Sequence, residues 1–114
     1  MILLFKLVLC HLVCDFTLQP DYVARNKNRN AGVPLGYDSK MHGPLAIIWP
    51  WVLTSHAATH AAGVYLVTGR ADAALVQLVV HWFVDFGKTG RWYGVHVDQC
   101  LHLLTMAAIA WWLR

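Results

Sequence analysis

Histidine and aspartate occur in this chain as pairs whose members lie four residues apart, inside or beside strongly apolar stretches. The stretch "VVHWFVDFGKTGRWYGVHVDQCLH", residues 79–102, contains two such pairs. Residues four apart lie on one face of a helix, one turn above each other. Each pair is therefore predicted to project from one face of its own helix. The four pairs are His11–Asp15, His56–His60, His81–Asp85 and Asp98–His102.

These residue types predict a divalent-metal site. Burying charged groups costs several kcal/mol each unless something compensates, and a cation provides that compensation. Neutral imidazole and carboxylate are ligands of Zn, Mn and Fe. One ion takes about four to six ligands, so the set fits two ions, or one ion whose histidines are oriented by aspartates. The alternative is a set of separate hydrogen-bonded polar groups. The predicted metal ligands are His11, Asp15, His56, His60, His81, Asp85, Asp98 and His102.

A metal of this kind lowers the pKa of bound water toward about 7 and polarises phosphoryl or acyl oxygens. Asp15, Asp85 and Asp98 are the candidate catalytic residues, since they supply ligands and one general base. Three further side chains are predicted to bind the ligands or the substrate, because they lie next to a pair or one turn beyond it: Gln19, Lys88 and Gln99.

The composition favours a membrane protein. The hydrophobic fraction is 58%, against about 45–50% in soluble domains, and only 13% is charged. No residue is Glu, although Glu is common on the wet faces of helices. Four apolar segments approach the length that spans a bilayer, so the expected fold is all-α, a single domain over 1–114 forming an up-down four-helix transmembrane bundle. The predicted helices are 2–24, 44–68, 71–86 and 95–113.

Basic residues set the expected orientation. The loop over residues 25–43 carries Arg25, Lys27, Arg29 and Lys40. Since cytoplasmic loops are enriched in Lys and Arg, we expect a multi-pass protein of the bacterial inner membrane with both termini outside. The metal site then lies near the cytoplasmic side. Membrane lipid is the expected partner, and this loop needs no nucleic acid to explain its charge. The three cysteines are too few for a disulfide framework.

Four motifs in order carry a family resemblance: "HLVCDFTLQPDYVARNK", "SHAATHAAG", "HWFVDFGK" and "VDQCLHLL". Together they resemble a family of small bacterial and phage membrane proteins catalogued as a domain of unknown function. The pattern of His and Asp is also distantly similar to an inner-membrane family described as metal-dependent hydrolases. The resemblance implies a fold and a ligand set but no reaction.

The predicted function is a metal-dependent hydrolase acting on a lipid-like or phosphorylated substrate. The alternative is a metal-ion or proton binding or transport protein without hydrolytic activity, because His and Asp chains also serve as ion relays. A haem protein explains the histidines but not the carboxylates. A phage pore-forming protein needs no such set of residues.

Overall fold

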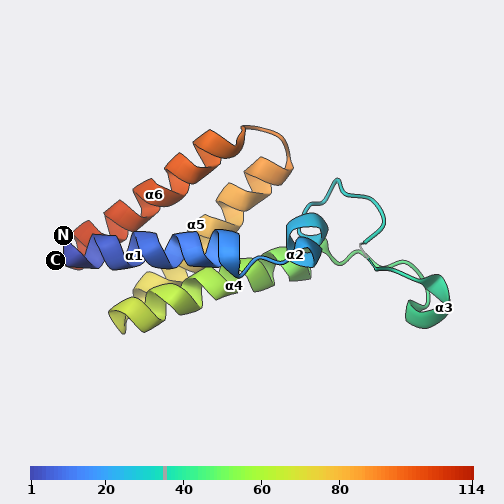
Figure 1. Ribbon diagram of the computed structural model, residues 1–114, viewed down its shortest axis with the longest axis horizontal. Helices are drawn as coiled ribbons and strands as arrows, with labels where there is room; N and C mark the ends of the chain where they lie inside the picture. Colours follow the sequence, from blue (N-terminus) through green and yellow to red (C-terminus); the bar gives the residue numbers. More distant parts are fainter. Residues whose placement is uncertain (35) are drawn as a thin grey trace.

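The computed structural model describes residues 1–34 and 36–114, and their regular structure is entirely helical, which confirms the all-α prediction. Figure 1 shows both termini at one end of the molecule, with the short helix α3 at the far end. The elements, in chain order, are α1 (Ile2–Leu12), a π-helix (Val13–Thr17), α2 (Asp21–Asn26), α3 (Ser39–His42), α4 (Trp49–Thr68), α5 (Ala71–Thr89) and α6 (Val95–Trp112).

Four helices position the polar pairs: α1 packs against α4 and α6, and α5 packs against α4 and α6. Their inward faces carry an apolar core near the chain termini, formed by Leu7, Val64, Ala73, Met106, Ile109 and Ala110. One helical turn from this core the same faces become polar. Leu7 is followed by His11, Val64 is preceded by His60, and Met106 is preceded by His102, each at a spacing of four residues. The polar pairs therefore continue the core stripes.

The first predicted helix, 2–24, is interrupted. The N–H of Leu18 donates to Val13 O at 2.9 Å, five residues back, which is the π-helical pattern. Pro20 then has an extended backbone (φ −68°, ψ 160°), and α2 begins at Asp21. A break beside proline is expected, because proline has no N–H to continue the helix. Single π-helical turns are frequent at functional sites, and this one contains the buried residues Cys14 and Asp15.

Two glycines shape the connections between α4, α5 and α6. Gly69 ends α4 in the left-handed conformation (φ 67°) and its N–H donates to Tyr65 O. Gly87 makes room for Tyr93, since a Cβ at Gly87 would lie 2.6 Å from the Tyr93 hydroxyl. That hydroxyl donates to Val84 O and so fastens the turn between α5 and α6.

The prediction of an integral membrane protein is wrong. Among the described residues, no helix has both the length and the apolar character needed to cross a bilayer. α1 has only 11 residues, against about 20 for a span. α5 has 19 residues but includes Asp72, Asp85 and Lys88. The transmembrane bundle, the multi-pass inner-membrane location with both termini outside, and the intramembrane placement of the site are all corrected by this finding.

Gly63 allows α4 to pack closely against α1, because it has no side chain. A Cβ at this position would collide with Cys10 Sγ and would lie 3.5 Å from Cys14 Sγ. We expect Gly63→Ala to destabilise the protein by about 1–3 kcal/mol through overpacking, despite the gain of about 1 kcal/mol in helix propensity.

Chemical denaturation of both single variants and of the Gly63→Ala/Cys10→Ala double variant checks this prediction. The double variant should recover most of the loss. If the losses of unfolding free energy in the two single variants instead add up to the loss in the double variant, the two residues do not contact each other.

Candidate metal centre

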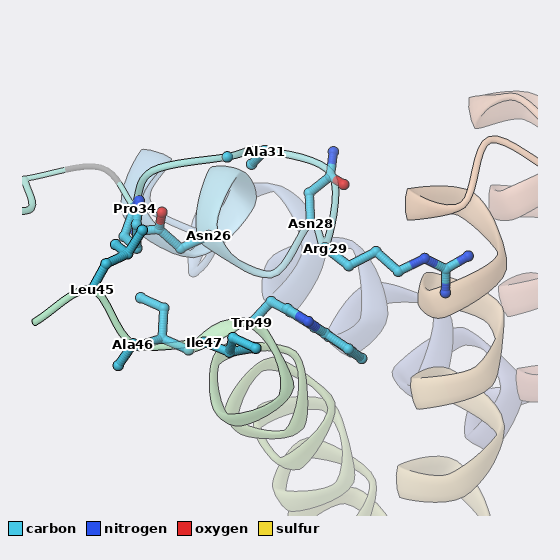
Figure 2. A pocket seen from close by; sticks show the side chains of 11 residues that line it. Asn26, Asn28, Arg29, Ala31, Pro34, Leu45, Ala46, Ile47 and Trp49 are labelled. Atoms are coloured by element: carbon cyan, nitrogen blue, oxygen red, sulfur yellow. The ribbon is translucent and has the colours of Figure 1, made fainter.

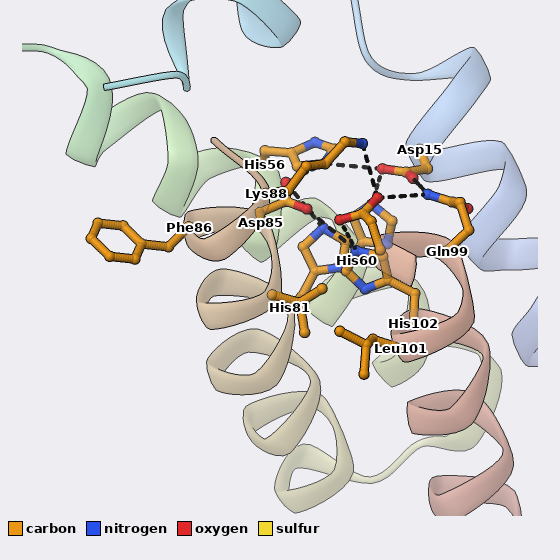
Figure 3. Close-up of polar contacts among 12 residues, drawn as sticks. Asp15, His56, His60, His81, Asp85, Phe86, Lys88, Gln99, Leu101 and His102 are labelled. Carbon is orange, nitrogen blue, oxygen red and sulfur yellow. Dashed lines mark hydrogen bonds and ion pairs between the residues drawn. The ribbon is translucent and has the colours of Figure 1, made fainter. Parts of the chain in front are cut away.

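All eight predicted ligands lie together. They come from α1 and its π-helical turn, α4, α5 and α6. Figure 3 shows Asp15, His56, His60, His81, Asp85 and His102 converging between the helices. Each is almost inaccessible to solvent: Asp15 is the most exposed, at 6%, while His81, Asp98 and His102 are at 0%. These eight residues are called the His/Asp cluster below.

The first set of ligand atoms in the cluster is rich in histidine. Asp15, His56, His60 and His81 can each place one ligand atom within 4.8 Å of all the others. The Nε2 atoms of His56 and His60 lie 3.3 and 3.6 Å from Asp15 Oδ1. Tetrahedral ligands bound at about 2.0–2.1 Å are separated by distances of this size. These two distances therefore fit ligands of one four-coordinate ion.

A second set is rich in carboxylate and consists of Asp85, Asp98 and His102. His102 Nε2 lies 3.3 Å from Asp85 Oδ1 and 3.6 Å from Asp98 Oδ1. The other oxygen of Asp85, Oδ2, faces the first set, at 3.5 Å from His56 Nε2 and 3.7 Å from His81 Nε2. The Asp85 carboxylate thus lies between the two sets and presents one oxygen to each.

The imidazole rings connect the two sets. His60 and His81 stack with ring centroids 3.7 Å apart, and His81 stacks on His102 at 4.2 Å. His11 lies beside them and can form a third ligand group with His81 and His102. The shared residues His81 and His102 thus link the three groups into one continuous centre.

Several buried ring nitrogens in the cluster make no hydrogen bond within the described part of the chain. They include Nε2 of His56, His60 and His81. The buried carboxylate oxygen Asp98 Oδ1 also makes no hydrogen bond there. A buried polar atom without a hydrogen bond costs about 1–3 kcal/mol. Three of these atoms belong to the histidine-rich set and the fourth to the carboxylate-rich set. Unbonded ligand atoms in both sets indicate that the cluster is arranged for cations, and this argues against separate hydrogen-bonded polar groups.

Two lysines bind carboxylate oxygens of the cluster, and the Asp85 oxygen that Lys27 binds is the one that faces the first set. Lys27, just after α2, donates to Asp85 Oδ2 at 2.5 Å and is 6% exposed. Lys88 on α5 donates to Asp98 Oδ2 at 2.8 Å. The sequence interpretation missed Lys27, which it counted among the basic residues of a loop. No apolar periodicity marks its segment, and a buried lysine is rare.

Three amide side chains lie at or near the cluster. Gln99 Nε2 donates to Asp15 Oδ2 at 2.7 Å and to Asp98 Oδ2 at 3.1 Å, which ties together carboxylates from two helices. Gln77 is buried beside His81, with 3.4 Å between Nε2 and Nδ1. Sequence analysis did not predict Gln77 as a site residue, although it lies four residues before His81 and so on the same face of the helix. Gln19 binds the backbone carbonyl of Asp15, not its carboxylate.

The ionisable side chains of the cluster have pKa values that are shifted in different directions. Burial lowers the pKa of His60 to about 4 and lowers that of His81 well below its ordinary value. Burial also opposes the charged form of His102, but Asp85 and Asp98 outweigh it and raise the pKa to about 9. Burial raises the pKa of Asp85, but His102 and Lys27 more than reverse this effect, so the pKa stays below its ordinary value. Burial also raises the pKa of Asp15 and Asp98, but neighbouring histidines outweigh it and the pKa of both is lowered. All three carboxylates are therefore ionised at neutral pH, and His60 and His81 are neutral, as metal ligands must be.

The segment that carries Lys27 also borders a pocket. Figure 2 shows this pocket between residues 26–34 and residues 45–49, with Trp49 and the stem of Arg29 on the side nearest α5. Its volume is about 260 Å³, and Asn26 and Asn28 contribute to its lining. The Arg29 guanidinium lies 3.7 Å from the centre of the Phe86 ring and fixes the segment on α5. One short segment thus separates the cluster from a pocket that can admit a small molecule.

A family model described as a protein of unknown function, DUF3307, matches residues 3–114, which include the whole cluster. The chain belongs to the DUF3307 family. No curated protein and no solved structure matches the chain. The match confirms the predicted membership of a family of unknown function, whereas it shows neither a phage or bacterial origin nor a likeness to metal-dependent hydrolases. For this DUF3307 chain, function is therefore argued from the cluster.

Proposed function

We propose that this DUF3307 protein binds divalent transition-metal ions in the His/Asp cluster and uses them as a cofactor. The observation that carries the proposal is that His56, His60 and His81 can each place a ring nitrogen within 4.8 Å of one another and of an Asp15 carboxylate oxygen, while Nε2 of all three makes no hydrogen bond within the described residues. Imidazole with carboxylate suits Zn, Mn and Fe. Hard oxygen-only ions such as Mg²⁺ suit it poorly.

The two ligand sets accommodate two ions. The set of Asp15, His56, His60 and His81 favours zinc, since four ligands in tetrahedral arrangement are its common coordination. The set of Asp85, Asp98 and His102 offers three protein ligands and leaves positions for water or substrate. Asp85, with one oxygen toward each set, would bridge the ions.

An open coordination position beside buried carboxylates favours hydrolysis. A metal ion bound there would supply an acidic water and polarise the substrate. Asp15, Asp85 and Asp98 would hold the ions or accept the proton of the attacking water, and Gln99 would fix the orientation of two of these carboxylates. Water adds across the scissile ester bond, and the released alcohol takes up a proton.

Calorimetric titration of the chelator-treated protein with Zn²⁺ and Mn²⁺ tests the proposal. We expect saturable binding of one to two ions per chain and a higher melting temperature at saturation, because a ligand that binds only the native state stabilises it. His60→Ala should weaken binding. His96→Ala is the matched control, since His96 is exposed and lies outside the cluster. Equal weakening by both variants, or no binding by folded wild type, would contradict the proposal.

The elevated pKa of His102 gives a prediction about protons. A metal must displace the proton of this imidazole at pH 7.5, because its pKa is about 9, so filling its ligand set should release about one proton per ion. Affinity at this set should therefore rise with pH up to about 9. Calorimetry in two buffers of different ionisation enthalpy measures the release. His102→Gln should abolish it, and an unchanged release in that variant would assign the proton elsewhere.

A further inference from the structure

The charges of the centre identify what it accepts. The cluster holds three carboxylates, and two ammonium groups are bonded to them: Lys27 to Asp85 and Lys88 to Asp98. These five side chains together carry one negative charge. One divalent ion makes the centre positive by one charge, and two ions make it positive by three. Because uncompensated charge in a buried site is costly, a loaded centre needs anionic ligands.

The placement of Lys88 shows where an anion would enter. Its side chain is 34% exposed, whereas the side chains of Asp85 and Asp98 are 2% and 1% exposed. Figure 3 shows Lys88 extending across the cluster toward Asp15 and Gln99. An ammonium group has three donors, and within the described residues Lys88 uses one of them, on Asp98 Oδ2. Two donors thus remain at the accessible edge of the centre.

From this arrangement we infer that the centre binds a phosphoryl group, received at its mouth by Lys88 and bound within by the metal ions. This inference rests on the proposed metal site. A phosphate monoester dianion together with one hydroxide cancels the three positive charges of the two-ion centre. A monocarboxylate together with one hydroxide leaves one of these positive charges uncompensated.

The binding of inorganic phosphate to the metal-loaded full chain tests this inference, and glycerol phosphate, glycerol and acetate complete the comparison. We expect both phosphates to bind and both glycerol and acetate to bind at least about 10-fold more weakly. Lys88→Gln should weaken phosphate binding about 10-fold, because it removes a charge-assisted hydrogen bond. Lys88→Arg should restore most of it, and Lys40→Gln is the control, since Lys40 is exposed.

The outcomes separate the inference from the proposed function. If wild type and Lys88→Gln both bind metal, but phosphate binds neither or binds both equally, the inference fails and the metal site stands. Acetate binding as tight as phosphate binding also overturns it. If the folded wild type binds no metal, both fail. Circular dichroism of Lys88→Gln and Lys88→Arg establishes that each variant is folded.

Discussion

Replacing Asp85 with alanine is expected to lower the free energy of unfolding by about 3–5 kcal/mol in chelator, because it leaves buried cations without their counter-charge. Asp85 binds the Lys27 ammonium at 2.5 Å and lies 3.3 Å from His102 Nε2. All three side chains are nearly inaccessible to solvent. The loss should be measured by denaturation in urea at pH 7.

The control for Asp85 is Asp72→Ala. Asp72 also pairs with a basic residue, Arg70, but its side chain is 48% exposed, and water compensates for the lost partner. That variant should unfold much like wild type. A double variant, Asp85→Ala with Lys27→Met, should recover part of the stability, since it removes the orphaned ammonium. Equal losses in the Asp85 and Asp72 variants would contradict the buried-charge explanation.

Replacing His81 with alanine is expected to lower metal affinity by more than about 100-fold. Outer partners of metal ligands already change affinity about 10–100-fold, and His81 can contribute to two of the three ligand groups. A competition titration against a chromophoric chelator measures the change. Gln77→Ala, which removes the amide beside His81 Nδ1, should have the smaller, outer-partner effect.

Two results would contradict this prediction. One is wild-type affinity in folded His81→Ala. The other is a larger loss in Gln77→Ala than in His81→Ala, which would show that the imidazole itself is not a ligand.

The four pairs could be assigned to one centre from sequence because spacing of four residues is a local property of a helix. His11, His60 and His102 each lie one turn from a core residue, so the faces that bury the core also bury the pairs. The α4, α5 and α6 bounds differ from the predicted ones by a few residues, chiefly at the N-terminus of α4, where residues 44–48 lie outside the helix.

The features that could not be predicted depend on tertiary contacts or on exact helix ends. Lys27 becomes a site residue only because the segment that follows α2 lies against α5, and that segment has no periodic pattern. The first helix was predicted too long, since apolar residues continue past the π-helical turn. The membrane interpretation rested on composition, and many large apolar side chains do lie on the outside, such as Leu66 and Trp111. Whether a helix can cross a bilayer depends on its length and on the polar residues within it, and the overall composition gives neither.

The central claim is that imidazoles and carboxylates of the His/Asp cluster bind a divalent ion. X-ray absorption at the zinc edge, on protein loaded with one equivalent of Zn²⁺, tests it most directly. We predict nitrogen and oxygen neighbours at about 2.0–2.1 Å with the outer-shell pattern of two to three imidazoles, and a weaker imidazole pattern in His81→Ala. A sulfur neighbour at about 2.3 Å would place the ion on Cys10 and Cys14 instead. A spectrum of hydrated zinc from folded protein would contradict the claim outright.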